Sequence, residues 1–224
     1  MERTAHNVDS QDIGSLMQNI DNWPRTIQAN LYRFYNRIIQ PATQNAPIHD
    51  EIVTGVAPDL DTFLDRAKAQ VDNYTANEAN KVYALVLIAL FERYLRLWAT
   101  SLLAGTAVDT QRGDVLVLLD IVAEKLDIDL VSQNLRATIQ EALLVGNVVR
   151  HGEGPSMKKV KLSAPHLIDR SKRQYVDLID QQTPDSEWVR ISPQELEYYI
   201  QAMIRFWGLA DKQPNAVTSY FMNG

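Results

Sequence analysis

Asn147 and His151 are the side chains in this sequence whose types and spacing are best suited to chemistry. They lie four residues apart in residues 141–154, where most of their neighbours are apolar residues that favour a helix. On a helix, this spacing puts both side chains on one face, about 40° apart. The amide of Asn147 could then orient the imidazole, and a histidine at a helix end could act as a general acid or base near neutral pH.

A purely structural role fits the same two residues. A histidine in the last turn of a helix interacts favourably with the helix dipole, by about 0.3–1 kcal/mol when it is exposed. Asn147 could instead bind a backbone carbonyl of a neighbouring helix. Gly152 suits the left-handed position just past a helix end, and with Gly154 it would leave the mouth of a site open to a bulky substrate. Both interpretations predict that this helix ends at His151.

The order of elements resembles the HEPN family of all-α domains. A long apolar helix is followed by a helix that ends in Asn-x-x-x-His-Gly, and the resemblance covers about residues 75–154. The family's motif is an arginine followed four to six residues later by a histidine, often written Arg-Asn-x-x-x-His. The resemblance implies a helical bundle that forms a homodimer, with a metal-independent endoribonuclease site made by the paired motifs. Many members of the family are bacterial toxins or antiphage-defence effectors.

This chain departs from the motif at one position, because Gly146 stands where the arginine is expected. In such a site the arginine would stabilise charge on the phosphate, which glycine cannot do. As a ribonuclease of this type, the chain would use His151 as the general acid–base or phosphate-polarising group and Asn147 to orient it. Arg150, about 100° round the helix from His151, could contribute across a dimer interface. The same departure leaves a second hypothesis open, a catalytically inactive helical module that binds a partner protein, for example in a toxin–antitoxin or defence system.

Three further charged residues could support the site. Glu92 directly follows the apolar run of residues 82–91, so it is either a buried polar partner or a charge where the helix emerges into solvent. Lys158 and Lys159 come shortly after His151. If this segment folds back, the two lysines could hold an RNA phosphate beside the histidine. The alternative is a solvated basic loop.

The composition excludes several other kinds of site. The chain has no cysteine, which rules out thiolate nucleophiles, disulfides and cysteine-based zinc sites. No phosphate-binding glycine loop or dinucleotide fingerprint occurs, so we expect no cofactor, and no histidine pair has the spacing of metal ligands, so we expect no metal. The formal net charge of -6 argues against a broad, non-specific nucleic-acid surface. The histidines are scattered, at His6, His49, His151 and His166.

The sequence predicts a cytoplasmic protein that does not enter a membrane. The N-terminal residues are polar and do not resemble a signal peptide. The longest apolar run, residues 82–91, is well short of the roughly 20 residues that a membrane-spanning helix needs.

Apolar residues recur at helical spacing along most of the chain, so we expect residues 1–224 to form one all-α domain, mainly a helical bundle. Residues 10–40 should form two helices, with a break before Pro24. Residues 41–58 contain three prolines and are predicted to be a loop. A shorter amphipathic segment follows. Thr75 and Glu78 then match a capping box, which predicts that the apolar central helix begins there and ends near Gly105.

The second half of the chain holds two further helices and a C-terminal region. The helices are predicted at residues 109–126 and from a cap at Ser132 to His151. Residues 155–210 should comprise a polar loop, a small β-hairpin that could form near residues 175–191, and a final helix. Ser192 and Glu195 form a capping box for that helix. Residues 211–224 are a tail without a strong signal.

Overall fold

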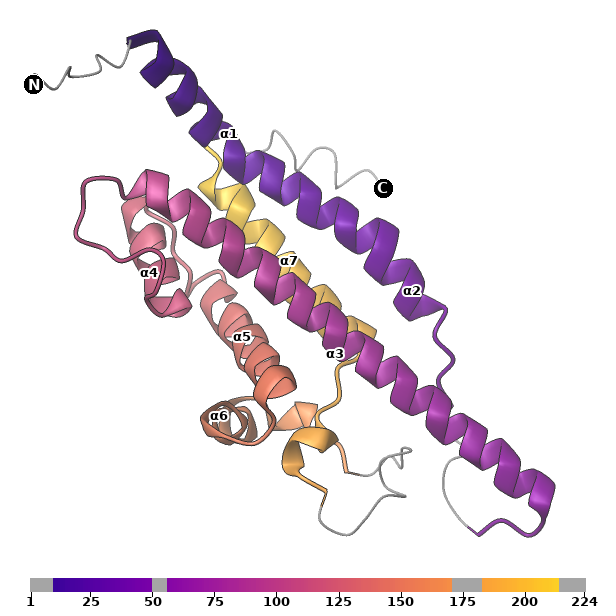
Figure 1. The fold of residues 1–224 in the computed structure, drawn as a ribbon. Coiled ribbons are helices and arrows are strands. Elements are labelled where there is room, and N and C mark those ends of the chain that lie inside the picture. Colours follow the sequence, from indigo (N-terminus) through magenta and orange to yellow (C-terminus); the bar gives the residue numbers. More distant parts are fainter. Residues whose placement is uncertain (1–9, 50–55, 171–182, 214–224) are drawn as a thin grey trace, which may run out of the picture.

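The protein is all-α, as the sequence predicts. We describe it from a computed structural model, which covers residues 10–49, 56–170 and 183–213 (Figure 1). Within these ranges there is no β-strand, and short 3-10 turns cover Pro165–Leu167 and Asp185–Trp188. The helices in chain order are α1 (Ser10–Phe34), a π-helical turn (Tyr35–Ile39), α2 (Gln40–Gln44), α3 (Leu60–Leu102), α4 (Val115–Lys125), α5 (Leu135–His151), α6 (Pro155–Ser163) and α7 (Pro193–Ala210).

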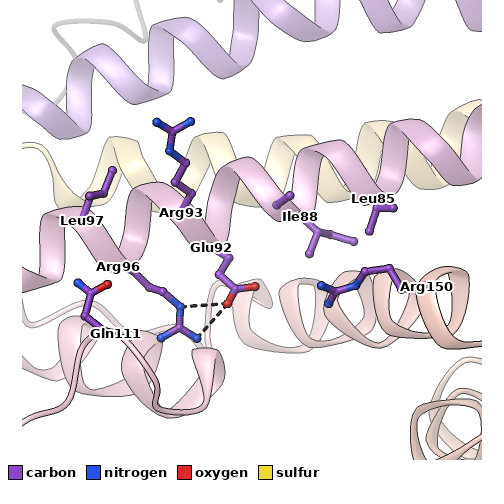
Figure 2. A pocket seen from close by; sticks show the side chains of 9 residues that line it. Leu85, Ile88, Glu92, Arg93, Arg96, Leu97, Gln111 and Arg150 are labelled. Carbon is purple, nitrogen blue, oxygen red and sulfur yellow. Dashed lines mark hydrogen bonds and ion pairs between the residues drawn. The ribbon is translucent and has the colours of Figure 1, made fainter.

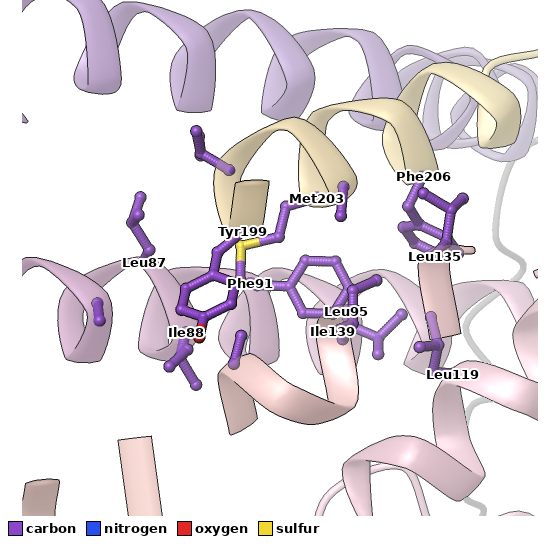
Figure 3. Close-up of a cluster of buried hydrophobic side chains, with 14 of the residues drawn as sticks. Leu87, Ile88, Phe91, Leu95, Leu119, Leu135, Ile139, Tyr199, Met203 and Phe206 are labelled. Carbon is purple, nitrogen blue, oxygen red and sulfur yellow. The ribbon is translucent and has the colours of Figure 1, made fainter. Parts of the chain in front are cut away.

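Helix α3 is the axis of the bundle. Helices α1, α4, α5 and α7 all pack on it, and α7 also lies against α1 and α5 (Figure 1). Aromatic side chains fill the centre, where the ring of Phe91 meets Phe206 at 5.7 Å and Trp207 at 6.1 Å in edge-to-face contacts. The side chains of Ile139 of α5 and Met203 of α7 lie beside the ring of Phe91 in the same core (Figure 3). The helix that contains the apolar run is therefore the central helix of the bundle, as predicted.

The N-terminal region corrects two predictions. Helix α1 continues through Pro24 without a break. Trp23 is partly buried and Ile27 is fully buried on one continuous face against the core, and this packing offsets the roughly 3 kcal/mol that an interior proline costs. Helical structure also extends to Gln44, so the predicted loop begins only after that residue. The π-helical turn allows this, because the amide of Gln40 donates to the carbonyl of Tyr35, five residues back.

Helix α3 begins fifteen residues before the predicted capping box. Its N-cap is Asp59, whose carboxylate accepts from the amide of Thr62 at 2.8 Å. Thr75 is exposed in the middle of the helix. Glu78 does not reach back to an amide but accepts from the ammonium group of Lys81 at 2.7 Å. The local capping signal is therefore overridden by tertiary contacts of the helix.

Those contacts come from three asparagines on one face of α3, which we call the asparagine ladder. Asn73 exchanges two hydrogen bonds with the backbone of His49. Asn77 donates to the carbonyl of Val189 at 3.2 Å and accepts from the amide of Ile191 at 3.1 Å. Asn80 donates to the carbonyl of Ile191 at 2.7 Å. The ladder thus fixes two non-helical segments against the central helix.

Helices α4 and α5 both begin later than predicted. The N-cap of α4 is Asp114. The turn before this helix is held by Asp109, whose carboxylate accepts a hydrogen bond from the amide of Arg112. Helix α5 begins after Asn134, which adopts a left-handed backbone conformation with φ of 54°. Ser132 does not cap this helix, because its amide donates to the carboxylate of Asp129 at 3.0 Å and so belongs to the preceding turn.

The predicted hairpin falls partly outside the described residues, which omit 171–182. In the part that is described, Val189 forms a single antiparallel bridge with Ile168. Trp188 ends a 3-10 turn, so this segment does not alternate as a strand would. The capping box at Ser192 is confirmed, and α7 begins where predicted. After α7, the carboxylate of Asp211 accepts two hydrogen bonds from Arg25 of α1 and ties the two helices together.

Tyr199 gives the fold a testable dependence on alkaline pH. Its ring is buried on α7, and its hydroxyl donates to Glu141 at 2.9 Å. Burial, followed by the charge of Glu141, raises the pKa of Tyr199 above its ordinary value. The unfolded chain then loses the tyrosine proton first, so the stabilisation is complete below pH about 10 and is lost as the pH rises beyond it.

We therefore expect the wild-type protein to lose stability above pH about 10 more steeply than Tyr199→Phe. The difference in slope should approach about 1.4 kcal/mol per pH unit, as measured by urea denaturation. Tyr198→Phe is the control, because that neighbouring side chain is exposed. Parallel slopes for Tyr199→Phe and the wild type would contradict the assignment.

Candidate functional site

The candidate site is built on the C-terminal end of α5. This helix ends at His151 as predicted, and Gly152 follows with a positive φ of 65°. The amide of Gly152 donates to the carbonyl of Val148 at 2.8 Å, which completes the last turn. Val145 and Val148 are buried on the inner face of the helix. Packing of this inner face leaves the outer face, with the predicted site residues, toward solvent.

Gly146 lies on the buried face, where α5 crosses α3. A Cβ atom placed on this glycine would lie 2.9 Å from the Cδ1 atom of Ile88, which is closer than real side chains approach one another. Ile88 of α3 therefore lies close against α5 at the position where the HEPN motif has arginine. A side chain at this position requires the Ile88 side chain to move.

Asn147 and His151 share the outer face, but the side chain of Asn147 is hydrogen-bonded to Arg150 rather than to His151. The Oδ1 atom of Asn147 accepts a hydrogen bond from the guanidinium of Arg150 at 2.7 Å. Among the described residues, no hydrogen bond joins Asn147 to His151, which is exposed at the end of the helix. The predicted orienting contact is thus absent from this conformation, and the amide positions Arg150.

Asn147 and Arg150 line a polar depression that we call the α3–α5 groove. Its volume is about 280 Å³, and its charged lining includes Glu92, Arg96 and Lys159. Four of the six residues predicted to take part in a site are therefore brought together here. Lys158 and His151 are not among the lining residues and lie exposed beside it.

A second hollow of about 440 Å³ continues from the groove along α3. It shares Glu92, Arg96 and Arg150 with the groove and adds Arg93 (Figure 2). Cationic side chains outnumber carboxylates in the combined lining, although the net charge of the whole chain is negative. A local concentration of guanidinium and ammonium groups of this kind favours a phosphate or carboxylate ligand.

Arg96 is the functional candidate that sequence reasoning missed. Its guanidinium donates to the carboxylate of Glu92 at 3.0 Å and to the carbonyls of Thr110 and Gly113 at 3.1 and 2.8 Å. Glu92 lies between the two alternatives considered for it, because its side chain is partly exposed and forms an ion pair with Arg96. The spacing of Glu92 and Arg96, four residues apart on a predicted helix, is the signal that could have identified the pair.

The basic run at residues 158–161 is helical, not the loop considered in the sequence interpretation. It lies on α6, whose buried residues Met157 and Val160 pack against the bundle. Lys158 and Lys159 are both exposed, and Lys159 is the one that lines the α3–α5 groove. Lys161 forms an ion pair with Asp185 and so has a structural partner.

Among the described residues, no group of three His, Cys, Asp or Glu side chains is arranged to hold a metal ion. Within the same ranges, no helix combines the length and apolar character required to cross a bilayer. Comparison with protein-family models, with curated proteins and with solved structures returned no match. Inferences about function therefore rest on the groove and on the end of α5.

Proposed function

We propose that this chain is a HEPN-like protein of the bacterial toxin or antiphage-defence type, and that it is a metal-independent endoribonuclease. One observation carries the proposal. Arg150 of α5 and Lys159 of α6 line one groove, and the exposed His151 directly follows Arg150 at the end of α5. A guanidinium binds phosphate oxygens with a rigid pair of donors, and an ammonium group adds a point charge. An RNA backbone is the substrate that suits such a lining.

In the proposed site, His151 transfers a proton to or from the reacting RNA linkage as a general acid or base. Arg150 stabilises the charge on the phosphate, which is the role that Gly146 leaves vacant. Asn147 holds Arg150 through the 2.7 Å hydrogen bond, so it positions the phosphate-binding group. We further propose that the chain acts as a homodimer in the cytoplasm.

The test is RNA cleavage by the purified full-length chain in the presence of EDTA. We expect the wild type to cut single-stranded RNA, and His151→Ala to reduce the rate by about 100-fold or more. Far-UV circular dichroism should remain unchanged, because His151 is exposed and is not part of the core. His166→Ala is the matched control, since this second exposed histidine lies away from the groove lining.

Intact RNA after incubation with the wild type would overturn the endoribonuclease proposal. Equal losses of activity in His151→Ala and His166→Ala would remove the specific role of His151.

A catalytically inactive module that binds a partner protein is the second candidate function. It is favoured by the packing of Gly146 against Ile88 and by the engagement of Asn147 with Arg150 rather than with His151. In this case the cationic groove would bind an acidic surface of the partner. RNA would stay intact with every variant, and the charge reversal Arg150→Glu would abolish complex formation with the partner while His151→Ala would not.

A further inference from the structure

Helix α3 is the longest helix in the described part of the chain, and it is much longer than α5 and α7, which pack beside it. Its 43 residues span about 64 Å at the rise of an α-helix, whereas the 17 residues of α5 and the 18 residues of α7 span about 26 and 27 Å. Its N-terminal turns consequently project from the bundle (Figure 1). We call residues 60–71 the α3 arm.

The α3 arm carries an apolar stripe on its outer face. The side chains of Leu60, Phe63, Leu64 and Val71 are 70%, 58%, 54% and 43% exposed. Their spacing puts them on one side of the helix together with Ala67. The opposite side turns toward the protein, where Ala69 is buried. Single exposed apolar residues are common, but a row of four large ones along one helical face is typical of an interaction surface.

The charges beside the stripe are complementary to those of a second α3 arm. Asp61, Asp65 and Lys68 lie along one flank of the stripe. When two identical helices pair antiparallel, the same flank of each helix meets across the contact, and the two sequences run in opposite directions along it. If the pair is centred between Leu64 and Ala67, Lys68 of one copy is level with position 63 of the other. It then lies between Asp61 and Asp65 of the second copy, one helical turn apart.

An antiparallel arrangement also suits the shape of the molecule. The arm joins the bundle at its C-terminal end, so antiparallel pairing places the two bundles at opposite ends of the paired arms (Figure 1). We propose that the α3 arm binds the α3 arm of a second copy of this chain, antiparallel and centred between Leu64 and Ala67. This proposal rests on the arm alone and does not require the chain to be a ribonuclease.

Sedimentation equilibrium of the full chain at tens of micromolar tests the association. The double variant Phe63→Asp, Leu64→Asp puts charge into the centre of the stripe, and we expect its apparent mass to fall about twofold relative to the wild type. Leu162→Asp is the matched control, because this residue is 85% exposed on α6, outside the arm, and its mass should equal that of the wild type. A monomeric wild type, or equal masses for the wild type and the double variant, would overturn the proposal.

A crosslinking experiment tests whether the contact lies on the arm. The chain contains no cysteine, so one introduced thiol can be followed without background. Ala67→Cys treated with a short bis-maleimide should give a covalent dimer at low protein concentration, and Leu162→Cys should not. Equal crosslinking of both variants would refute a specific contact at the arm. RNA cleavage is measured separately on the same samples, so failure of the arm contact and failure of the proposed ribonuclease can be told apart.

Discussion

Gly146→Arg, which introduces the arginine of the HEPN motif, is expected to unfold much of the protein rather than to increase its activity. The position is buried against α3, and even a Cβ atom would lie 2.9 Å from Ile88. Overpacking costs about 1–3 kcal/mol, and an unpaired buried charge costs about a further 3–5 kcal/mol. The expected loss of about 4–8 kcal/mol is comparable with the whole stability of a typical domain. Urea denaturation followed by circular dichroism measures it.

Gly146→Ala tests the same contact with a single methyl group. Ile88→Val removes the Cδ1 atom that the new methyl would meet, so the two substitutions should compensate each other. We expect the free energy of unfolding of the double variant to exceed the additive value by about 1 kcal/mol. Additive effects would show that Ile88 does not exclude side chains from position 146. A stable Gly146→Arg protein with increased RNA cleavage would contradict our interpretation more directly.

The α5 end illustrates what the sequence could predict about the site. Helical spacing and a following glycine correctly predicted where the helix ends and that Asn147 and His151 share its outer face. The spacing could not show which side chain donates a hydrogen bond to Asn147, because Arg150 and His151 are both within one helical turn of it. It also could not show that Glu92 and Arg96 lie across the groove from Arg150, since that depends on how α3 and α5 cross.

Helix α3 shows which part of the fold could not be predicted from the sequence. The periodicity of its apolar residues predicted a central helix, and its C-terminal end was predicted closely. Its start was not, because Thr75 and Glu78 carry the local signal of a helix cap. The contacts that continue the helix through this point reach segments more than 110 residues away. Local propensity does not contain such information, so a continuous α3 could not be inferred from the sequence alone.

Asn77→Ala is expected to lower the free energy of unfolding by about 2–6 kcal/mol. The side chain is 6% exposed and satisfies two backbone groups, the carbonyl of Val189 and the amide of Ile191. Removing it leaves both groups buried without their partner, at about 1–3 kcal/mol each. Asn80→Ala frees only the carbonyl of Ile191 and should cost about 1–3 kcal/mol. Chemical denaturation of the three proteins measures this order.

Thr75→Ala is the matched control on the same helix, and it also separates two interpretations of α3. If Thr75 were an N-cap, its loss would cost about 0.5–2 kcal/mol. At an exposed interior position, alanine should instead stabilise the helix by a few tenths of a kcal/mol, roughly the difference in helix propensity. A destabilised Thr75→Ala together with an unaffected Asn77→Ala would mean that the helix begins at the local cap. The opposite result would establish that contacts between distant segments, rather than local signals, hold α3 as one helix.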